Sequence, residues 1–143
     1  MIVRQAVPQD VDSILNLEQE CMPHPWDIKD IAALTEDDKK IAIAAEEDGV
    51  LIGYVGASFI FDEAEIGNIC VTSSHRRQGV AGVLFEKLYK ELQDKGVKTI
   101  FLEVERSNTG AIALYERQGF TMYNERKDYY GAGRDALLYR KDI

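Results

Sequence analysis

An anion-binding loop is predicted by one short segment, Arg76-Arg77-Gln78-Gly79-Val80-Ala81-Gly82. The segment follows an apolar strand pattern and opens an amphipathic helix pattern, whose first turn carries unbonded amides and a partial positive charge. The small residues let a diphosphate approach those amides, and the two arginines add positive charge. The alternative interpretation is an ordinary helix start with small residues for packing.

Two common nucleotide motifs are missing from this segment. A P-loop needs G-x-x-x-x-G-K-[ST], and a dinucleotide fingerprint needs a complete G-x-G-x-x-G. Neither pattern occurs here. The loop therefore favours an anion other than a nucleotide held in one of those two ways.

A single carboxylate, Glu103, interrupts the apolar run IFLEV. Strand alternation places Ile100, Leu102 and Val104 on one face and Phe101 and Glu103 on the other. A carboxylate in such a strand either lies at a rim and points to water or is placed for a purpose. Glu103 is therefore a candidate proton acceptor.

The two cysteines and two histidines give no plausible four-ligand zinc set, so we expect no metal site. Cys70 lies between Ile69 and Val71, and no histidine is near it in the sequence to activate a thiolate. We interpret it as a small buried thiol rather than an acyl-carrying nucleophile.

The elements that would position these residues follow the order β-α-α-β-β-β-α-β-α-β-β. Asp10 is expected to cap the first helix, and a second helix is expected from Asp27 to Leu34. Asp48-Gly49 predicts a tight hairpin, TEDDKK a polar loop and DEAE a turn. Either Ser107 or Asn108 can cap the last helix. One β-α-β unit in the middle indicates an α+β (mixed α/β) fold rather than a doubly wound nucleotide fold.

Composition and charge limit the class of protein. The 143 residues, 45% hydrophobic and 29% charged, suit a single domain spanning residues 1–143. A net charge of -8 disfavours direct nucleic-acid binding and permits a basic partner. The sequence shows neither a signal peptide nor an apolar run of membrane-spanning length, so we expect no membrane association and a cytoplasmic location with reduced thiols.

The loop residues match a known family. R-R-Q-G-V-A resembles the Q/R-x-x-G-x-G/A motif of the GNAT acetyltransferases, and Asn108 to Phe120 resembles their N-x-x-A-x-x-L-Y-x-x-x-G-F pattern. Several stretches resemble the bacterial RimI-type ribosomal-protein-alanine N-acetyltransferases: PW at Pro25-Trp26, DEAEIGNICV, HRRQGVAG, LEVERSNTGAIALYERQGF and RKDYYGAGRDALLY. The resemblance implies a mixed, mostly antiparallel sheet of about seven strands flanked by about four helices.

The resemblance also implies an activity and its residues. Acetyl-CoA is the implied cosubstrate, without a metal, and the acceptor is a basic protein N-terminus, the N-terminal alanine of the eighteenth small-subunit ribosomal protein. Glu103 is the implied proton acceptor and Tyr115 the implied proton donor. The implied cofactor-binding residues are Ile69, Cys70, Val71, Arg76, Arg77, Gln78, Gly79, Val80, Ala81, Gly82, Asn108 and Tyr115. Trp26, Tyr129 and Tyr130 are candidates for the peptide groove.

Two other functions remain open at this point. A GNAT enzyme for a different amine, such as a lysine side chain or a small molecule, would need Glu103 and Tyr115 as well. A non-catalytic acetyl-CoA sensor would need only the loop. The short GAG segment before Arg134 departs from the family pattern where the peptide would be gripped.

Overall fold

The computed structural model describes all 143 residues and contains seven strands, four α-helices and two short 3₁₀ turns. The elements are β1 (Ile2–Gln5), a 3₁₀ turn (Pro8–Asp10), α1 (Val11–Cys21), α2 (Ile28–Glu36), β2 (Lys40–Glu47), β3 (Val50–Ile60), β4 (Glu63–Val71), a 3₁₀ turn (Ser73–His75), α3 (Val80–Asp94), β5 (Thr99–Glu105), α4 (Thr109–Arg117), β6 (Thr121–Arg126) and β7 (Ala136–Asp142). The predicted order of strands and helices is confirmed. None of the helices combines the length and the apolar content needed to cross a membrane.

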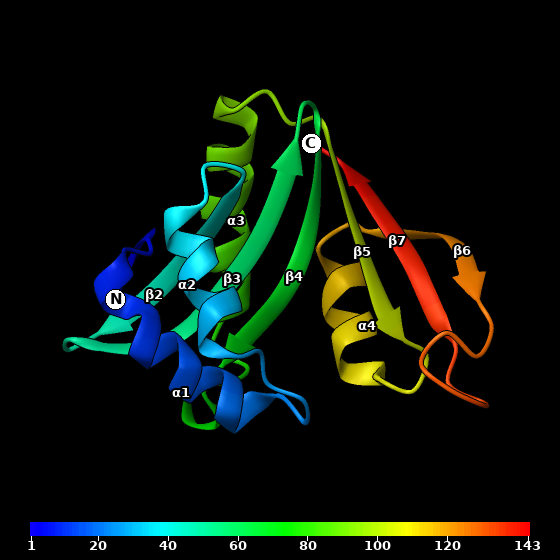
Figure 1. Ribbon diagram of the computed structural model, residues 1–143, viewed down its shortest axis with the longest axis horizontal. Helices are drawn as coiled ribbons and strands as arrows, with labels where there is room; N and C mark the ends of the chain where they lie inside the picture. Colours follow the sequence, from blue (N-terminus) through cyan, green and yellow to red (C-terminus); the bar gives the residue numbers. More distant parts are fainter.

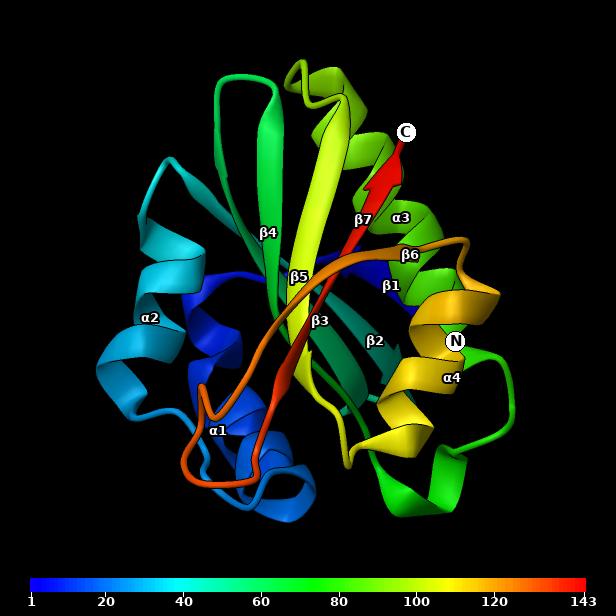
Figure 2. The same cartoon turned by 90° about the vertical axis from the view of Figure 1, so that its right-hand side faces the viewer.

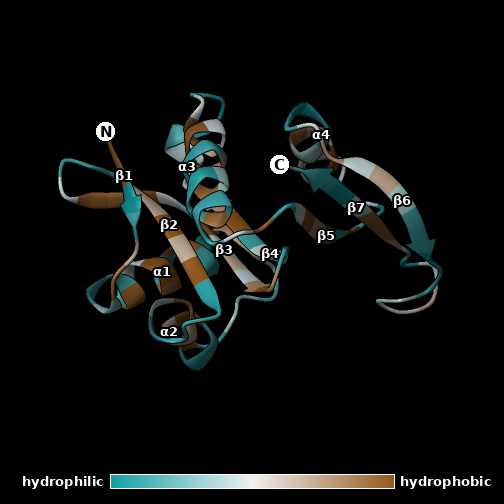
Figure 3. Ribbon diagram, turned by 90° about the horizontal axis from the view of Figure 1, so that it is seen from above, coloured by the Kyte–Doolittle hydropathy of each residue, from teal (hydrophilic) through white to brown (hydrophobic).

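All seven strands belong to one sheet, in the order β1-β2-β3-β4-β5-β7-β6. Neighbouring strands are antiparallel except β4 and β5, which run parallel and are connected through α3. Helices α1 and α2 cover one face of the sheet, and α3 and α4 cover the other (Figure 1; Figure 3). The predicted fold class, a mixed and mostly antiparallel sheet flanked by helices, is confirmed.

The core has two layers that meet across β2. Ile41, Ile43 and Ala45 point into the layer that contains the apolar side of α3. Ala42 and Ala44 point into the layer beneath α1 and α2. Burial on both faces explains why this strand is apolar at nearly every position instead of at every second one.

The turn between β2 and β3 has the predicted geometry. Asp48 and Gly49 have φ values of 52° and 80°, the left-handed backbone that a two-residue hairpin requires. Two neighbouring turns are shorter than predicted. Residues 35 and 36 of TEDDKK complete α2 and Lys40 begins β2, while β4 already begins at Glu63 in DEAE. The turn after β3 is therefore confined to Phe61 and Asp62, because pairing with β3 extends β4 backwards.

The role predicted for Asp10 is wrong. Its carboxylate makes no capping bond to α1. It accepts hydrogen bonds from Arg4 Nη1 and Nη2, at 2.7 and 2.9 Å, and from the amide of Val7 at 2.8 Å. The guanidinium of Arg4 lowers the pKa of Asp10. A charged partner on β1 thus outcompetes the local helix amides for this carboxylate.

Candidate active site

The candidate site is built around the place where β4 and β5 separate. The two parallel strands pair only from Glu63 to Glu65 and from Thr99 to Phe101. Beyond these pairs β4 stays with β3 and β5 stays with β7, so the two strands diverge like the arms of a V (Figure 1). After Glu65, the edge of β4 that faces β5 therefore has no neighbouring strand, while the opposite edge stays paired with β3.

Three of the predicted cofactor-binding residues, Ile69, Cys70 and Val71, lie on this open stretch of β4. The amide of Thr72 donates to the carbonyl of Ile52 on β3 at 2.8 Å. Because hydrogen-bonding directions alternate along a strand, the polar backbone groups of Ile69 and Val71 face the open edge. An extended molecule with amide groups can pair there as an added strand would.

The loop that follows β4 presents a row of unbonded amides. None of the backbone amides from Arg77 to Gly82 donates to a backbone carbonyl. Arg77 and Gly79 both have left-handed backbones, with φ values of 62° and 81°. Successive amides in such a conformation form a concave site for an anion, here at the start of the 15-residue helix α3.

The small residues of this loop are not required for packing. A Cβ added at Gly79 would meet no atom within 4 Å, and one at Gly82 would meet only the tip of Gln118, at 3.9 Å. Gly79 instead provides the left-handed turn and leaves the path to the amides open. This geometry favours the anion site over the packing alternative.

Two predicted cofactor-binding residues have part of their hydrogen-bonding capacity occupied within the protein. Arg76 Nε donates to the carbonyl of Val71 at 3.1 Å, so this guanidinium is turned back towards the end of β4. Asn108 Oδ1 accepts from the amide of Ala111 at 3.2 Å and caps α4, as predicted. The side-chain nitrogen of Asn108 is left for another partner.

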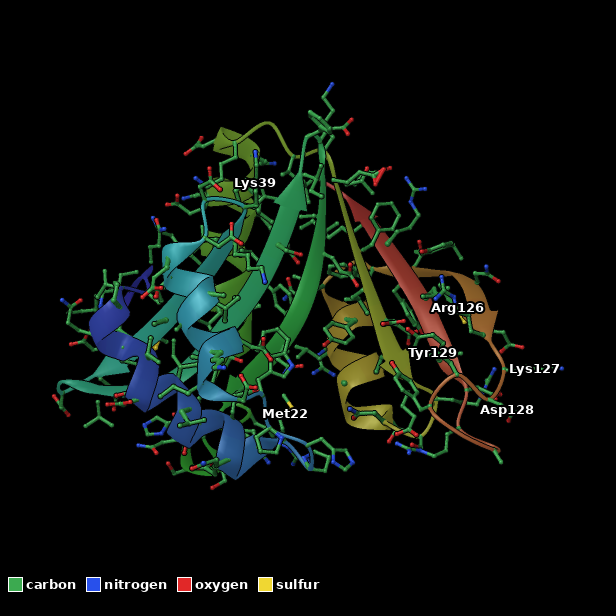
Figure 4. The ribbon with its side chains drawn as sticks, viewed as in Figure 1. Met22, Lys39, Arg126, Lys127, Asp128 and Tyr129 are labelled. Atoms are coloured by element: carbon green, nitrogen blue, oxygen red, sulfur yellow. The ribbon has the colours of Figure 1, made fainter.

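Glu103 lies on the predicted face of β5. Residues 100, 102 and 104 are buried, whereas Glu103 is half-buried on the opposite face. Its carboxylate takes part in none of the salt bridges of the protein. Glu103 lines a groove of about 620 Å³, which also includes Lys39 on one side and Arg126 and Tyr129 on the other (Figure 4).

Tyr115 projects from α4 into the core beneath the open strands and is only 7% exposed. Its ring makes edge contacts with Phe85 and Phe120, at centroid distances of 6.3 and 6.0 Å. Burial raises the pKa of Tyr115 to about 12, and the nearby Cys70 and Tyr130 contribute in the same direction. Its phenol therefore keeps its proton at neutral pH.

The two tyrosines of the β6–β7 connection lie close to the predicted proton acceptor. The rings of Tyr129 and Tyr130 meet edge to face at 5.1 Å. Burial raises the pKa of Tyr130, and the negative charge of Glu103 raises it further. Arg134 fixes the short GAG loop by donating to the Tyr130 carbonyl at 3.2 Å and to Glu105 at 2.5 Å.

Trp26 lies apart from these tyrosines. It lines a smaller hollow of about 200 Å³ that adjoins the groove and shares Lys40, Ser58 and Glu65 with it. Its indole rests directly on Gly67 of β4, where an added Cβ would approach the ring to 2.5 Å. The structure thus places Trp26 in the hollow and Tyr129 in the adjoining groove.

Sequence reasoning missed the role of Glu18, whose side chain is completely buried beneath α1. One available signal was its spacing of four residues from Ile14, which puts it on the buried side of the helix. Cys70, 2% exposed, donates its thiol hydrogen to Glu18 Oε2 at 3.1 Å. Burial and this carboxylate raise the pKa of Cys70, so it remains a thiol. No group of three or more His, Cys, Asp or Glu side chains is arranged to hold a metal ion.

The open β4 edge, the unbonded loop amides and the parallel β4–α3–β5 unit form a site for an extended, amide-containing molecule that carries an anionic group. The chain belongs to the acetyltransferase (GNAT) family, whose model matches residues 11–120. The family and enzyme class predicted from R-R-Q-G-V-A are confirmed.

Among its relatives is the ribosomal protein bS18-alanine N-acetyltransferase of Escherichia coli strain K12, which is 34% identical over 121 residues. The match covers 85% of this chain and 81% of the relative. The putative ribosomal protein bS18-alanine N-acetyltransferase of Bacillus subtilis strain 168 is 32% identical over 139 residues, covering 95% of this chain and 91% of the relative. The predicted likeness to this subfamily is therefore confirmed.

Solved structures show the same relationship. The crystal structure of the ribosomal-protein-S18-alanine N-acetyltransferase from Escherichia coli superimposes with a TM-score of 0.90 at 30% identity, covering 99% of this chain and 93% of the other. An aminoglycoside 6'-N-acetyltransferase complexed with coenzyme A gives a TM-score of 0.88 at 19% identity, covering 99% of this chain and 97% of the other. The second likeness concerns the fold alone.

Proposed function

We propose that this enzyme transfers the acetyl group of acetyl-CoA to the N-terminal α-amine of a protein, with the N-terminal alanine of ribosomal protein bS18 as its acceptor. The observation that carries the proposal is the relationship to bS18-alanine N-acetyltransferases along nearly the whole chain, at 34% and 32% identity. Such an acceptor is made in the cytoplasm, where we place the reaction.

The open parts of the structure fit acetyl-CoA. Its pyrophosphate suits the unbonded amides from Arg77 to Gly82, and its amide-containing pantetheine arm suits the open edge at Ile69 and at the amide of Val71, whose carbonyl already accepts from Arg76. The side-chain nitrogen of Asn108, at the start of α4, is also available. When bound there, the cosubstrate supplies an activated acetyl thioester.

Glu103 is proposed as the group that removes the proton from the acceptor. Attack requires a neutral amine, and an N-terminal amine, with a pKa near 7.7–8.0, loses its proton at neutral pH for about 1 kcal/mol. A lysine amine, with a pKa near 10.4, would need roughly 4 to 5 kcal/mol. One half-buried carboxylate without a cation partner, acting through a water molecule, is adequate for the α-amine.

Tyr115 is proposed as the proton donor to the departing thiolate. The new bond joins the amine nitrogen to the acetyl carbon, the carbon–sulfur bond breaks, and the thiolate takes a proton from the phenol. Burial raises the pKa of Tyr115 to about 12, so the phenol is fully protonated when the thiolate leaves, and the same shift makes it a weaker acid than an ordinary tyrosine. A thiol with a pKa near 8.5 leaves readily, so this assistance is useful without being indispensable.

The overall charge of the protein suits a basic peptide. Glu63, Glu65 and Glu103 line the groove together with three cations, Lys39, Lys40 and Arg126, so the groove itself is not acidic overall. The protein as a whole carries a net charge of -8. This net charge favours association with a cationic segment behind the reacting terminus.

A panel of peptides tests the proposed acceptor. Initial rates would be compared for a basic peptide beginning Ala-Arg, the same peptide beginning with a bulky residue, and an Ala-terminal peptide whose basic residues are replaced by acidic ones. We expect the first peptide to react at least about tenfold faster than either alternative, which corresponds to about 1.4 kcal/mol. Equal rates on all three would overturn the assignment of a basic, alanine-first acceptor.

A further inference from the structure

The completely buried side chain of Glu18 connects two parts of the site. Its Oε1 accepts hydrogen bonds from the backbone amide of Trp26 at 3.1 Å and from Asn68 Nδ2 at 2.9 Å. Its Oε2 accepts from Asn68 Nδ2 at 3.2 Å and from the thiol of Cys70 at 3.1 Å. One carboxylate on α1 therefore holds the loop before α2 and the open part of β4 together.

Burial of this carboxylate costs free energy of desolvation, so its contribution to the stability of the core is small. Glu18 takes part in none of the salt bridges, and all of its hydrogen-bond donors are uncharged. The nearby hydroxyl of Tyr54 is buried without a hydrogen-bond partner. A well-packed apolar side chain usually serves stability as well as a buried carboxylate does, so the polar contacts point to a geometric role.

The residues that Glu18 holds lie on opposite sides of the site. Asn68 and Cys70 flank Ile69, whose backbone faces the open edge that fits acetyl-CoA. Trp26 lines the acceptor side and rests on Gly67 of the same strand. Fixing the Trp26 amide against β4 therefore fixes the distance between the acceptor wall and the cofactor strand.

The last turn of α1 makes further contacts of this kind. Glu20 accepts hydrogen bonds from the Thr72 hydroxyl and the Ser73 amide, at 3.0 and 2.8 Å, just before the anion loop. These two residues belong to the connection between β4 and α3, on the cofactor side alone. Within this turn, the contacts of Glu18 are the ones that reach Trp26.

We propose that Glu18 is a positioning residue, which sets the Trp26 wall of the acceptor site against the acetyl-CoA strand β4. This inference rests on the proposed function. It adds a residue that touches neither the acceptor nor the cosubstrate and acts through Trp26, Asn68 and Cys70.

Steady-state kinetics separates positioning from stability. In Glu18→Ala we expect the KM for the Ala-terminal peptide to rise at least tenfold while the acetyl-CoA Kd changes less than threefold, because the anion loop is untouched. Glu18→Gln keeps an acceptor oxygen and should fall between wild type and Glu18→Ala. Leu17→Ala, a buried apolar neighbour on α1, is the matched control: it should lower the Tm without changing peptide KM well below that Tm. A rise in peptide KM of equal size in both alanine variants would overturn the proposal.

Trp26 also provides a readout that needs no acceptor, because it is the only tryptophan in the chain. Glu18→Ala and Gly67→Ala should each shift its emission to longer wavelength and increase its quenching by acrylamide, whereas Leu17→Ala should leave both unchanged. If wild type acetylates no peptide, the proposed function fails, and this fluorescence still tests Glu18. Emission and quenching identical to wild type in folded Glu18→Ala and Glu18→Gln would contradict the positioning role.

Discussion

The two sides of the V between β4 and β5 are built from different parts of the chain. On the cofactor side, backbone groups form the candidate contacts: the amides from Arg77 to Gly82 and the open edge at Ile69 and Val71. On the proposed acceptor side, side chains from distant segments line the site: Glu103 and Tyr129 line the groove, and Trp26 lines the adjoining hollow. In Figure 2 the α1–α2 loop, β5 and the β6–β7 connection, which carry these side chains, have colours from blue to orange and so lie far apart along the chain.

This difference matters for substrate choice. A binding site made of backbone groups tolerates most substitutions, provided that the backbone keeps its geometry. Such a site suits a cosubstrate that a whole family shares. A groove made of side chains changes with each substitution, so it suits the part of the reaction that distinguishes one amine from another. Variants on the two sides should therefore affect different measured constants.

The largest effect is expected at the meeting point of the two sides. Glu103→Gln should lower kcat for transfer to an α-amine about 100-fold at neutral pH, the usual scale for a general base. The acetyl-CoA Kd, measured by titration calorimetry, should stay within about twofold, because this carboxylate is not a cofactor contact. Glu86→Gln, which removes an exposed carboxylate from α3, controls for the charge change. Unchanged turnover would remove Glu103 from the mechanism.

Gly79→Val should act on the cofactor side alone. Loss of even one amide bond to a charged phosphate removes about 1.5–3 kcal/mol, so we expect acetyl-CoA to bind at least tenfold more weakly. Gly49→Val is a close control, because Gly49 has nearly the same φ, 80° against 81°, and equally open surroundings. Both variants carry the same backbone strain. Equal acetyl-CoA affinities in the two would refute the anion loop.

Tyr115→Phe should lower kcat about tenfold, less than a typical proton-transfer group, because a thiolate leaves readily. The pH profile gives a second test. A raised pKa keeps the phenol protonated to higher pH, so the rate should rise as the amine loses its proton near pH 8 and stay level past pH 10, the ordinary pKa of tyrosine. Tyr89→Phe, in the same aromatic cluster, is the control. A wild-type rate that falls by half near pH 10 would contradict the buried phenol as donor.

Tyr129→Ala should have the smallest effect, on the acceptor side. Tyr129 is 49% exposed, and the guanidinium carbon of Arg126 lies 5.4 Å from the centroid of its ring. Removal of such a rim contact typically costs about 0.5–1 kcal/mol, so peptide KM should rise roughly threefold to fivefold with no change in acetyl-CoA Kd. Phe61→Ala, outside the groove and 89% exposed, should change neither constant. An altered acetyl-CoA Kd in Tyr129→Ala would contradict the claim that acceptor-side variants leave cosubstrate binding unchanged.

The same division explains what the sequence could predict. Local signals identified the hairpin at Asp48-Gly49, the cap at Asn108 and the alternation around Glu103, because each depends on residues within one turn or strand. The anion loop was predictable for the same reason. Its backbone geometry follows from the types and order of seven neighbouring residues.

Contacts between distant segments could not be predicted in this way. Asp10 was assigned to the helix next to it, but its partner is Arg4 on β1. Glu18 has the spacing of a buried residue, yet its partners Asn68 and Cys70 lie about 50 positions further along the chain. Trp26 stays a predicted acceptor residue, and nothing local to it in the sequence indicates that Gly67 supports its ring.

The central claim, acetyl transfer to an α-amine, can be tested directly by mass spectrometry. The protein and acetyl-CoA would be mixed with a basic peptide that begins Ala-Arg and contains one lysine, and in parallel with the same peptide carrying a blocked terminus. We predict a single acetyl group on the free N-terminus and none on the blocked peptide. Acetylation of the lysine in both peptides would contradict the account and identify a side-chain acetyltransferase instead.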